Sequence, residues 1–140
     1  IIVSGRIKHY ISAFGEHVIG KEVETALQNA ISGTNISVNE FTVAPQINPK
    51  SGLPYHEWLI EFDSEPEDLE AFALKIDAEM RQQNVYYDDL IKGNVLRTIV
   101  ITKIVKNGFQ EYMKSIGKLG GQNKLPRLSN DRKIADFFVV

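Results

Sequence analysis

The pattern of hydrophobic and polar residues predicts two neighbouring strands in the first half of the chain. Residues 36–44 and 55–62 are rich in strand-forming side chains, and a loop with three prolines and a glycine joins them. The second segment alternates, with apolar side chains on one face and glutamates on the other: Trp58, Ile60 and Phe62 against Glu57 and Glu61. We therefore expect one face of this strand to be buried and the other to be polar.

Apolar residues at helical spacing predict a long helix before this pair and another after it. The first helix spans about residues 20–32, and Gly33 provides a C-terminal stop. The second follows a capping box at Ser64, has Pro66 in its first turn and continues to about Gln82. Each helix has one apolar stripe and therefore needs a surface against which to pack.

The second half of the chain contains shorter elements. Residues 86–92 are expected to form a helical turn that ends at Gly93, and residues 96–105 a strand with two buried faces. Two helices follow, with expected bounds of 109–116 and from a cap at Ser129 toward Phe138.

Two short strands, residues 1–3 and 8–14, are expected to precede these elements. The order of helices and strands predicts an α+β fold with a small antiparallel or mixed sheet of about three strands. Helices flank this sheet, and the two N-terminal strands form a separate segment.

The length and composition limit the class of protein. A chain of 140 residues suits a single domain, and without cysteine it has neither disulfides nor a thiolate metal site. Its apolar runs are shorter than the roughly 20 residues that cross a bilayer. We expect a cytoplasmic protein that does not bind membranes. Because the chain starts at Ile1 rather than Met, we also expect it to be part of a longer protein.

The net charge of −2 hides an uneven distribution of charge along the chain. Residues 57–89 contain eleven acidic side chains and two basic ones, whereas residues 103–133 contain eight basic side chains and two acidic ones. Such a division is compatible with two solvated faces, or with a basic end that meets the phosphate of a nucleotide or a nucleic acid.

The basic end includes a glycine-rich segment, residues 117–128. It combines three glycines with Lys118, Lys124 and Arg127. Glycines allow the backbone to approach a ligand, and cationic side chains donate charge-assisted hydrogen bonds to phosphate. The order of residues does not match a Walker loop. The pattern alone therefore fits either an active-site loop or a solvated surface loop.

This segment is one of four motifs that occur in the order typical of one protein family. The motifs are Gly5–Lys8, Phe14–Glu16, Asn84–Leu90 and Gly117–Arg127. With them, the chain resembles the C-terminal domain of the auxin-responsive Gretchen Hagen family of acyl acid amido synthetases. The resemblance extends from Gly5 to about Asp136. The last two motifs are specific, whereas short glycine motifs such as the first two are widespread.

The resemblance implies a single C-terminal lid domain of an ATP-dependent, adenylate-forming ligase. Residues 1–16 would form a hinge and hairpin segment, 17–116 the α+β core, and 117–140 an active-site loop and terminal helix. The missing N-terminal adenylation domain would be the partner, and the isolated lid would be inactive. The full-length enzyme would use ATP and Mg²⁺, with neither held tightly by this domain.

The resemblance also implies the reaction and the residues that serve it. A small-molecule carboxylic acid would be adenylated, and the amine of an amino acid would then displace AMP. Lys124 is the best match to the lysine that reaches the adenylate in related enzymes, and Lys118 is its rival. Six further residues are expected near the nucleotide or at the hinge: Arg6, Lys8, Gly15, Glu16, Gln122 and Arg127.

Structural alternatives accompany several of these assignments. Gly15 and Glu16 are also compatible with a tight turn before the first helix, and Arg127 with a surface salt bridge. The three histidines share no ligand spacing, so no metal site is expected in this domain.

Two other functions remain as alternatives at this point. One is the lid of an acyl-CoA-type ligase, which has the same first step. The other is a free-standing ferredoxin-like binding module. A nucleic-acid partner is not expected, because the aromatic residues lie mainly among acidic ones.

Overall fold

The computed structural model describes residues 10–11, 16, 18–47, 49–50, 52–115, 127–128 and 132–138. Its helices and strands follow one another as β1 (Tyr10–Ile11), β2 (Val18–Ile19), α2 (Gly20–Ile31), β3 (Ser37–Gln46), β4 (Tyr55–Ser64), α3 (Leu69–Gln83), α4 (Val85–Lys92), β5 (Val100–Lys103), α5 (Gly108–Ser115) and α6 (Lys133–Phe137).

The main sheet has three strands in the order β3-β4-β5. Strand β3 pairs with β4 in antiparallel fashion, and β5 pairs with β4 in parallel fashion. The parallel pair is connected through α3 and α4, as expected when a crossover must return the chain to the same end of a sheet. Strands β1 and β2 form a separate antiparallel ladder. The predicted α+β fold with a small mixed sheet is confirmed.

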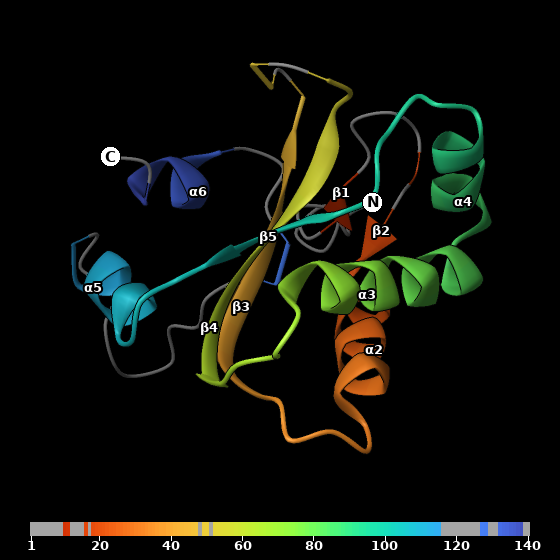
Figure 1. Ribbon diagram of the computed structural model, residues 1–140. Helices are drawn as coiled ribbons and strands as arrows, with labels where there is room; N and C mark the ends of the chain where they lie inside the picture. Colours follow the sequence, from red (N-terminus) through yellow and green to blue (C-terminus); the bar gives the residue numbers. More distant parts are fainter. Residues whose placement is uncertain are drawn as a thin grey trace, which may run out of the picture.

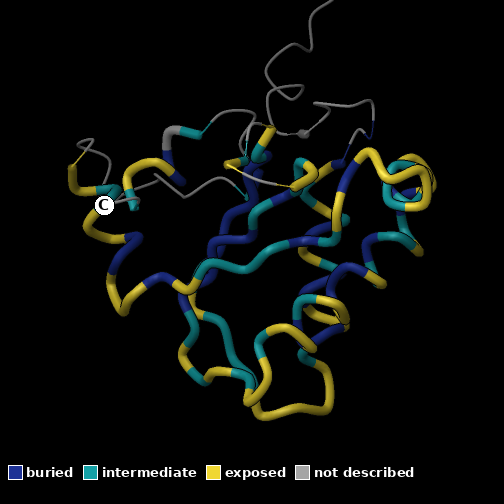
Figure 2. The backbone as a smooth tube through the Cα atoms, turned by 45° about the horizontal axis from the view of Figure 1, so that its top comes forward, coloured by how far each residue is buried: buried dark blue, intermediate teal, exposed yellow. Residues whose placement is uncertain are grey.

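Helices cover both faces of the main sheet. Figure 1 shows α2, α3 and α4 on one side and α5 with α6 on the other. The larger hydrophobic cluster contains Trp58 and Ile60 of β4 together with the inner faces of α2 and α3. The smaller cluster contains Leu59 of the same strand together with Phe109 and Ile134. Buried backbone follows the central strands, whereas the connecting loops are exposed (Figure 2).

Helix α2 forms where the apolar spacing predicts it. Its buried residues are Val23, Ala26, Leu27 and Ala30. The carboxylate of Glu22 accepts a hydrogen bond from the backbone N–H of Ile19 and so closes the first turn. Gly33 has a positive φ of 77°, a conformation in which glycine ends helices readily.

The predicted start of α3 at Ser64 is wrong. Strand β4 continues through Ser64, which pairs with Ser37, so this residue is committed to the sheet. The helix begins at Leu69, and Asp68 caps it by accepting a hydrogen bond from the N–H of Ala71. Pro66 therefore precedes the helix instead of occupying its first turn.

The glutamate face of β4 is polar, as predicted, but it is buried instead of facing water. Glu61 is only 2% exposed, and its carboxylate accepts hydrogen bonds from the side chain of Asn39 and from the backbone N–H groups of Asn107 and Phe109. Helix α5 covers this face of the sheet, so the glutamate binds the start of that helix instead of facing water.

Strand β5 is shorter and more exposed than the pattern predicts. It begins at Val100 because the N–H groups before it bond elsewhere: that of Arg97 to the carbonyl of Pro54, and that of Ile99 to Asp77. Val100, Ile101 and Thr102 are half-buried and Lys103 is exposed. Within the described part of the chain, β5 lies at an edge of its sheet, which explains the incomplete burial.

The remaining short elements agree with the predictions to different degrees. Helix α4 is a two-turn helix that ends before Gly93, and α5 begins one residue before Phe109. Tyr10 and Ile11, the described residues of the predicted strand 8–14, pair with β2 as β1. Helix α6 begins at Lys133. The predicted cap at Ser129 and the predicted strand 1–3 lie outside the described residues.

Candidate functional site

Two of the predicted site residues, Glu16 and Arg127, lie in the described structure. The other predicted site residues lie outside it and stay predictions: Arg6, Lys8, Gly15, Lys118, Gln122 and Lys124. The structure therefore shows the surroundings of Glu16 and Arg127 and of the residues next to the predicted loop in sequence.

The chain on both sides of the predicted active-site loop is held by the folded core. Helix α5 ends at Ser115, on the side of the smaller cluster. Leu128 forms a parallel bridge with Val43 of β3, and the N–H of Val43 donates to the carbonyl of Arg127 at 2.9 Å. Leu128 is 2% exposed within the larger cluster. In sequence, the predicted loop thus lies between a helix of one layer and a residue bridged to β3.

Arg127 is bound by acidic and aromatic side chains. Its guanidinium lies 4.7 Å from the centre of the Phe41 ring and donates to the Phe41 carbonyl. It also forms ion pairs with Glu24, at 3.2 Å, and with Glu40. These groups border a hollow of about 200 Å³ between α2 and β3. Because two carboxylates already balance this charge, the salt-bridge alternative describes Arg127 in this structure, and its contact with a phosphate stays a prediction.

Glu16 is fully buried beside His56 of β4. The Nε2 atom of His56 lies 2.6 Å from Oε2 of Glu16, and the two side chains are 2% and 0% exposed. Pro45 lies opposite His56 on β3, only two residues from Val43. The structure therefore brings Glu16 and the end of the predicted loop to the same stretch of the β3–β4 pair.

Asn84 connects this region to two helices. It ends α3, and its side-chain oxygen caps α4 by accepting from the N–H of Tyr87. Its amide nitrogen donates to the carbonyl of Glu16 at 2.8 Å and to the carboxylate of Glu22 at 3.2 Å. One buried side chain thus links the N-terminal segment, α2 and the α3–α4 junction.

A second buried acid, Asp77, lies next to this group. The hydroxyl of Tyr87 donates to its Oδ1 atom at 2.5 Å, and the N–H of Ile99 donates at 3.2 Å. Burial raises the pKa of Asp77, and the hydrogen bonds from Tyr87 and Ile99 partly oppose that change. Burial also raises the pKa of Tyr87 well above its usual value, so this residue remains a proton donor. Its ring lies 5.3 Å from that of His56.

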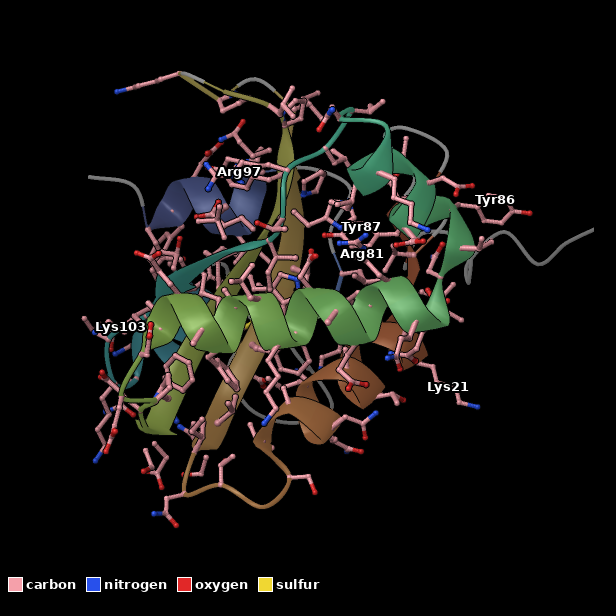
Figure 3. All side chains as sticks on the ribbon, turned by 45° about the vertical axis from the view of Figure 1, so that its right-hand side comes forward. Lys21, Arg81, Tyr86, Tyr87, Arg97 and Lys103 are labelled. Carbon is pink, nitrogen blue, oxygen red and sulfur yellow. The ribbon has the colours of Figure 1, made fainter. Side chains whose placement is uncertain are left out.

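The order of residues in the motif Tyr86–Asp89 has a local structural reason. Tyr87 turns inward beside Arg81, whereas Tyr86 points outward (Figure 3) and is 61% exposed. Asp88 pairs with Arg81 at 2.6 Å and with Lys92 at 3.0 Å. The hydrogen bond from Arg81, followed by that from Lys92, lowers the pKa of Asp88. The motif therefore fastens α4 to α3.

The end of the chain is fastened in a similar way. Arg132, before α6, forms an ion pair with Glu57 of β4 at 2.6 Å, and Thr102 of β5 donates to the same carboxylate.

Among the described residues, no group of three or more metal-ligating side chains is placed to hold an ion. None of the described helices is long and apolar enough to cross a membrane.

The sequence interpretation missed the roles of His56, Asn84 and Asp77. A signal existed for each of them. His56 has the same phase on β4 as Trp58, and Asp77 lies beside the apolar stripe of α3. Asn84 precedes a short helix and belongs to a residue type that commonly caps helices.

Comparison with known proteins places these features in context. Residues 21–133 match the model of the GH3 family C-terminal domain, the family that the sequence motifs resemble. A solved structure of a GH3.15 acyl acid amido synthetase is similar at a TM-score of 0.73 and 17% identity. A second structure, AtGH3.15 acyl acid amido synthetase in complex with 2,4-DB, is similar at a TM-score of 0.70 and 15% identity.

The similarity covers most of this chain but a minor part of the solved proteins. Each match covers 92% of this chain and 25% of the other chain. The chain thus spans about a quarter of the length of these synthetases. A search of curated proteins gave no match.

Proposed function

The chain belongs to the GH3 family and corresponds to the C-terminal domain of that family, and on this basis we propose that it is the lid of an acyl acid amido synthetase. The observation that carries the proposal is the family match over residues 21–133. The fold shared with two acyl acid amido synthetases supports it. The activity would belong to a longer protein, in which this domain closes over a separate nucleotide site.

The proposed reaction has two steps. A carboxylate oxygen attacks the α-phosphorus of ATP, so that an acyl-adenylate forms and pyrophosphate leaves. The nitrogen of an amino acid then attacks the acyl carbon, AMP leaves, and the amine loses a proton. Negative charge accumulates on phosphate oxygens in the first step, where a lysine delivered by a closing lid would be most effective.

The positions of the described residues on either side of the loop agree with a role for Lys124 in that step. The chain is held before the loop by α5 and after it by Arg127 and Leu128. A loop held on both sides can carry a side chain to another domain without losing its own position on the core. We propose that Lys124 meets the α-phosphate in this way, with Lys118 as the alternative.

ATP and Mg²⁺ belong to this proposal as ligands of the full-length protein. Since no metal-binding group occurs among the described residues, Mg²⁺ would be bound by the nucleotide phosphates and by the remainder of the protein. The acid and the amine would likewise be selected mainly outside this domain.

The test is pyrophosphate exchange in the full-length protein. We expect Lys124→Ala to slow exchange by about a hundred- to a thousandfold, because one charge-matched donor in the transition state is lost. Lys118→Ala should have a much smaller effect. Lys114→Ala, at the exposed end of α5, is the matched control and should exchange like the wild type.

The variants also separate the competing assignments. Slow exchange in Lys118→Ala with normal exchange in Lys124→Ala would transfer the role to Lys118, and normal exchange in both would remove this loop from adenylation. Product analysis with amino acids and with coenzyme A as acceptors distinguishes an amido synthetase from an acyl-CoA-type ligase.

A further inference from the structure

Glu16, which lies shortly before α2, makes buried polar contacts with the rest of the domain. Its carboxyl group contacts His56, and its backbone carbonyl accepts a hydrogen bond from Asn84. Its side chain is fully buried. Strand β2, two residues later, has one buried side chain, Val18, and one exposed side chain, Ile19. Among the described residues just before α2, Glu16 and Val18 are therefore the ones that the core encloses.

Breaking the Glu16–His56 contact is costly whichever partner is removed. Removing His56 takes one hydrogen-bond partner from a buried carboxyl group, and removing Glu16 takes one from the buried imidazole ring. Moving the segment away from the core would also expose the amide of Asn84, which then loses its bond to the Glu16 carbonyl. The contacts thus favour one fixed position of the segment.

We propose that Glu16, His56 and Asn84 form an anchor that holds the described residues just before α2, namely Glu16, Val18 and Ile19, in a fixed position on the lid. In this inference Glu16 is a positioning residue, and it acts through His56 and Asn84 rather than through contact with the nucleotide. The inference rests on the proposed function, since it concerns how the closing movement of a lid is transmitted from the preceding chain.

The geometry explains why this anchor matters for a lid. His56 lies on β4, the central strand of the sheet, and Asn84 lies at the junction of α3 and α4. Through these two residues, Glu16 is therefore connected directly to the sheet and to two helices. The end of the predicted active-site loop bonds to Val43, close to the partner of His56 on β3. The anchor and Arg127 consequently contact neighbouring residues of the same β3–β4 pair.

The first test measures the attachment itself, by amide hydrogen exchange in the full-length protein without substrates. We expect Glu16→Ala and His56→Ala to accelerate exchange at Val18 and Ile19 by about tenfold or more, because a buried charge-assisted hydrogen bond is lost. Exchange in the centre of β4 should stay unchanged. His56→Gln, which keeps an N–H donor, should restore part of the protection.

Tyr87→Phe is the matched control. It removes another buried hydrogen bond from the same region, that to Asp77, and leaves the aromatic ring beside His56 in place. We expect it to lower global stability without a selective increase of exchange at Val18 and Ile19. A selective increase in this variant, equal to that in Glu16→Ala, would overturn the anchor, and so would normal protection in both Glu16→Ala and His56→Ala.

The second test measures catalysis. Glu16→Ala and His56→Ala should lower kcat for amide formation about tenfold or more with little change in KM for the acid, because binding sites elsewhere remain intact while closure is uncoupled. Tyr87→Phe should keep its kcat at a temperature where it is folded. Loosened exchange with unchanged kcat would refute the coupling to catalysis. If the wild type forms no adenylate at all, the proposed function fails, while the exchange result still decides whether the anchor exists.

Discussion

At the scale of single residues, Asp77 shows how burial changes acid–base behaviour in this domain. It is 2% exposed, and the raised pKa reflects the cost of holding a charge away from water. A carboxyl group whose pKa is raised by folding stabilises the fold fully below its unfolded pKa. That contribution is lost as the pH rises through the pKa of the folded state.

Asp77→Asn should therefore stabilise the protein at neutral pH. The amide oxygen can still accept from Tyr87, and the variant avoids burying a charge. We expect a higher free energy of unfolding at pH 7. The advantage should shrink as the pH falls toward 3.8, the ordinary pKa of an aspartate. Urea unfolding at several pH values measures it.

The matched control is Asp89→Asn, an exposed position on α4. This variant should follow the wild type at every pH. An advantage of Asp77→Asn that stayed constant down to pH 3 would contradict the assignment, since it would mean that ionisation of Asp77 is not its source.

The site could be predicted from the sequence only in part, and residue contacts explain why. A glutamate after a glycine suggests a loop, but its burial depends on His56, which is 40 residues away in the sequence. A salt bridge at Arg127 is one of the two alternatives that the sequence suggests. The partners of Arg127 on α2 and β3, however, follow only from the tertiary arrangement. Short sequence patterns cannot specify such distant partners.

At the scale of elements, the start of α5 depends on the absence of a side chain at Gly108. A Cβ atom there would lie 2.5 Å from Cγ2 of Ile104 and 3.3 Å from the ring of Phe138. Ile104 is buried and β-branched, so it has little freedom to move away. The first turn of α5 can therefore pack closely against the end of β5 and the residue after α6.

Gly108→Ala should consequently destabilise the protein. We expect a loss of about 1–3 kcal/mol, as is usual when an additional methyl group is forced into a packed core. Chemical unfolding gives the value. Gly20→Ala is the control, because a Cβ at Gly20, in the first turn of α2, meets nothing within 4 Å. That variant should be neutral or slightly stabilised. Equal losses in both variants would mean that close packing at Gly108 is not the source of the effect.

The elements themselves were predictable where the local pattern agreed with the tertiary environment. Helix α2 has a continuous apolar stripe and a glycine stop, and it forms as expected. Helix α3 starts later than its capping box suggests because pairing with Ser37 extends β4 through Ser64. The polar face of β4 is buried because α5, from a distant part of the chain, supplies donors for Glu61. Each error thus arises from a contact between distant segments.

At the scale of the whole molecule, the sheet separates two layers of unequal size. The layer with α2 and α3 contains the larger cluster of buried residues, and the layer with α5 and α6 the smaller one. Less buried apolar area means less stabilisation, so the second layer is expected to open more easily. Of the residues that flank the predicted active-site loop, Ser115 ends a helix of the smaller layer, and Leu128 belongs to the larger cluster.

Adjacent residues of β4 allow this difference to be measured. Leu59 is 1% exposed in the smaller layer, and Ile60 is 0% exposed in the larger one. Replacing either by alanine should cost about 2–5 kcal/mol in the layer to which it belongs. We expect Leu59→Ala to accelerate hydrogen exchange mainly in α5 and α6, and Ile60→Ala to accelerate it throughout the domain. The reason is that the larger layer supports the smaller one, whereas the smaller layer can open alone. Uniform acceleration in both variants would instead mean that the two layers unfold as a single cooperative unit.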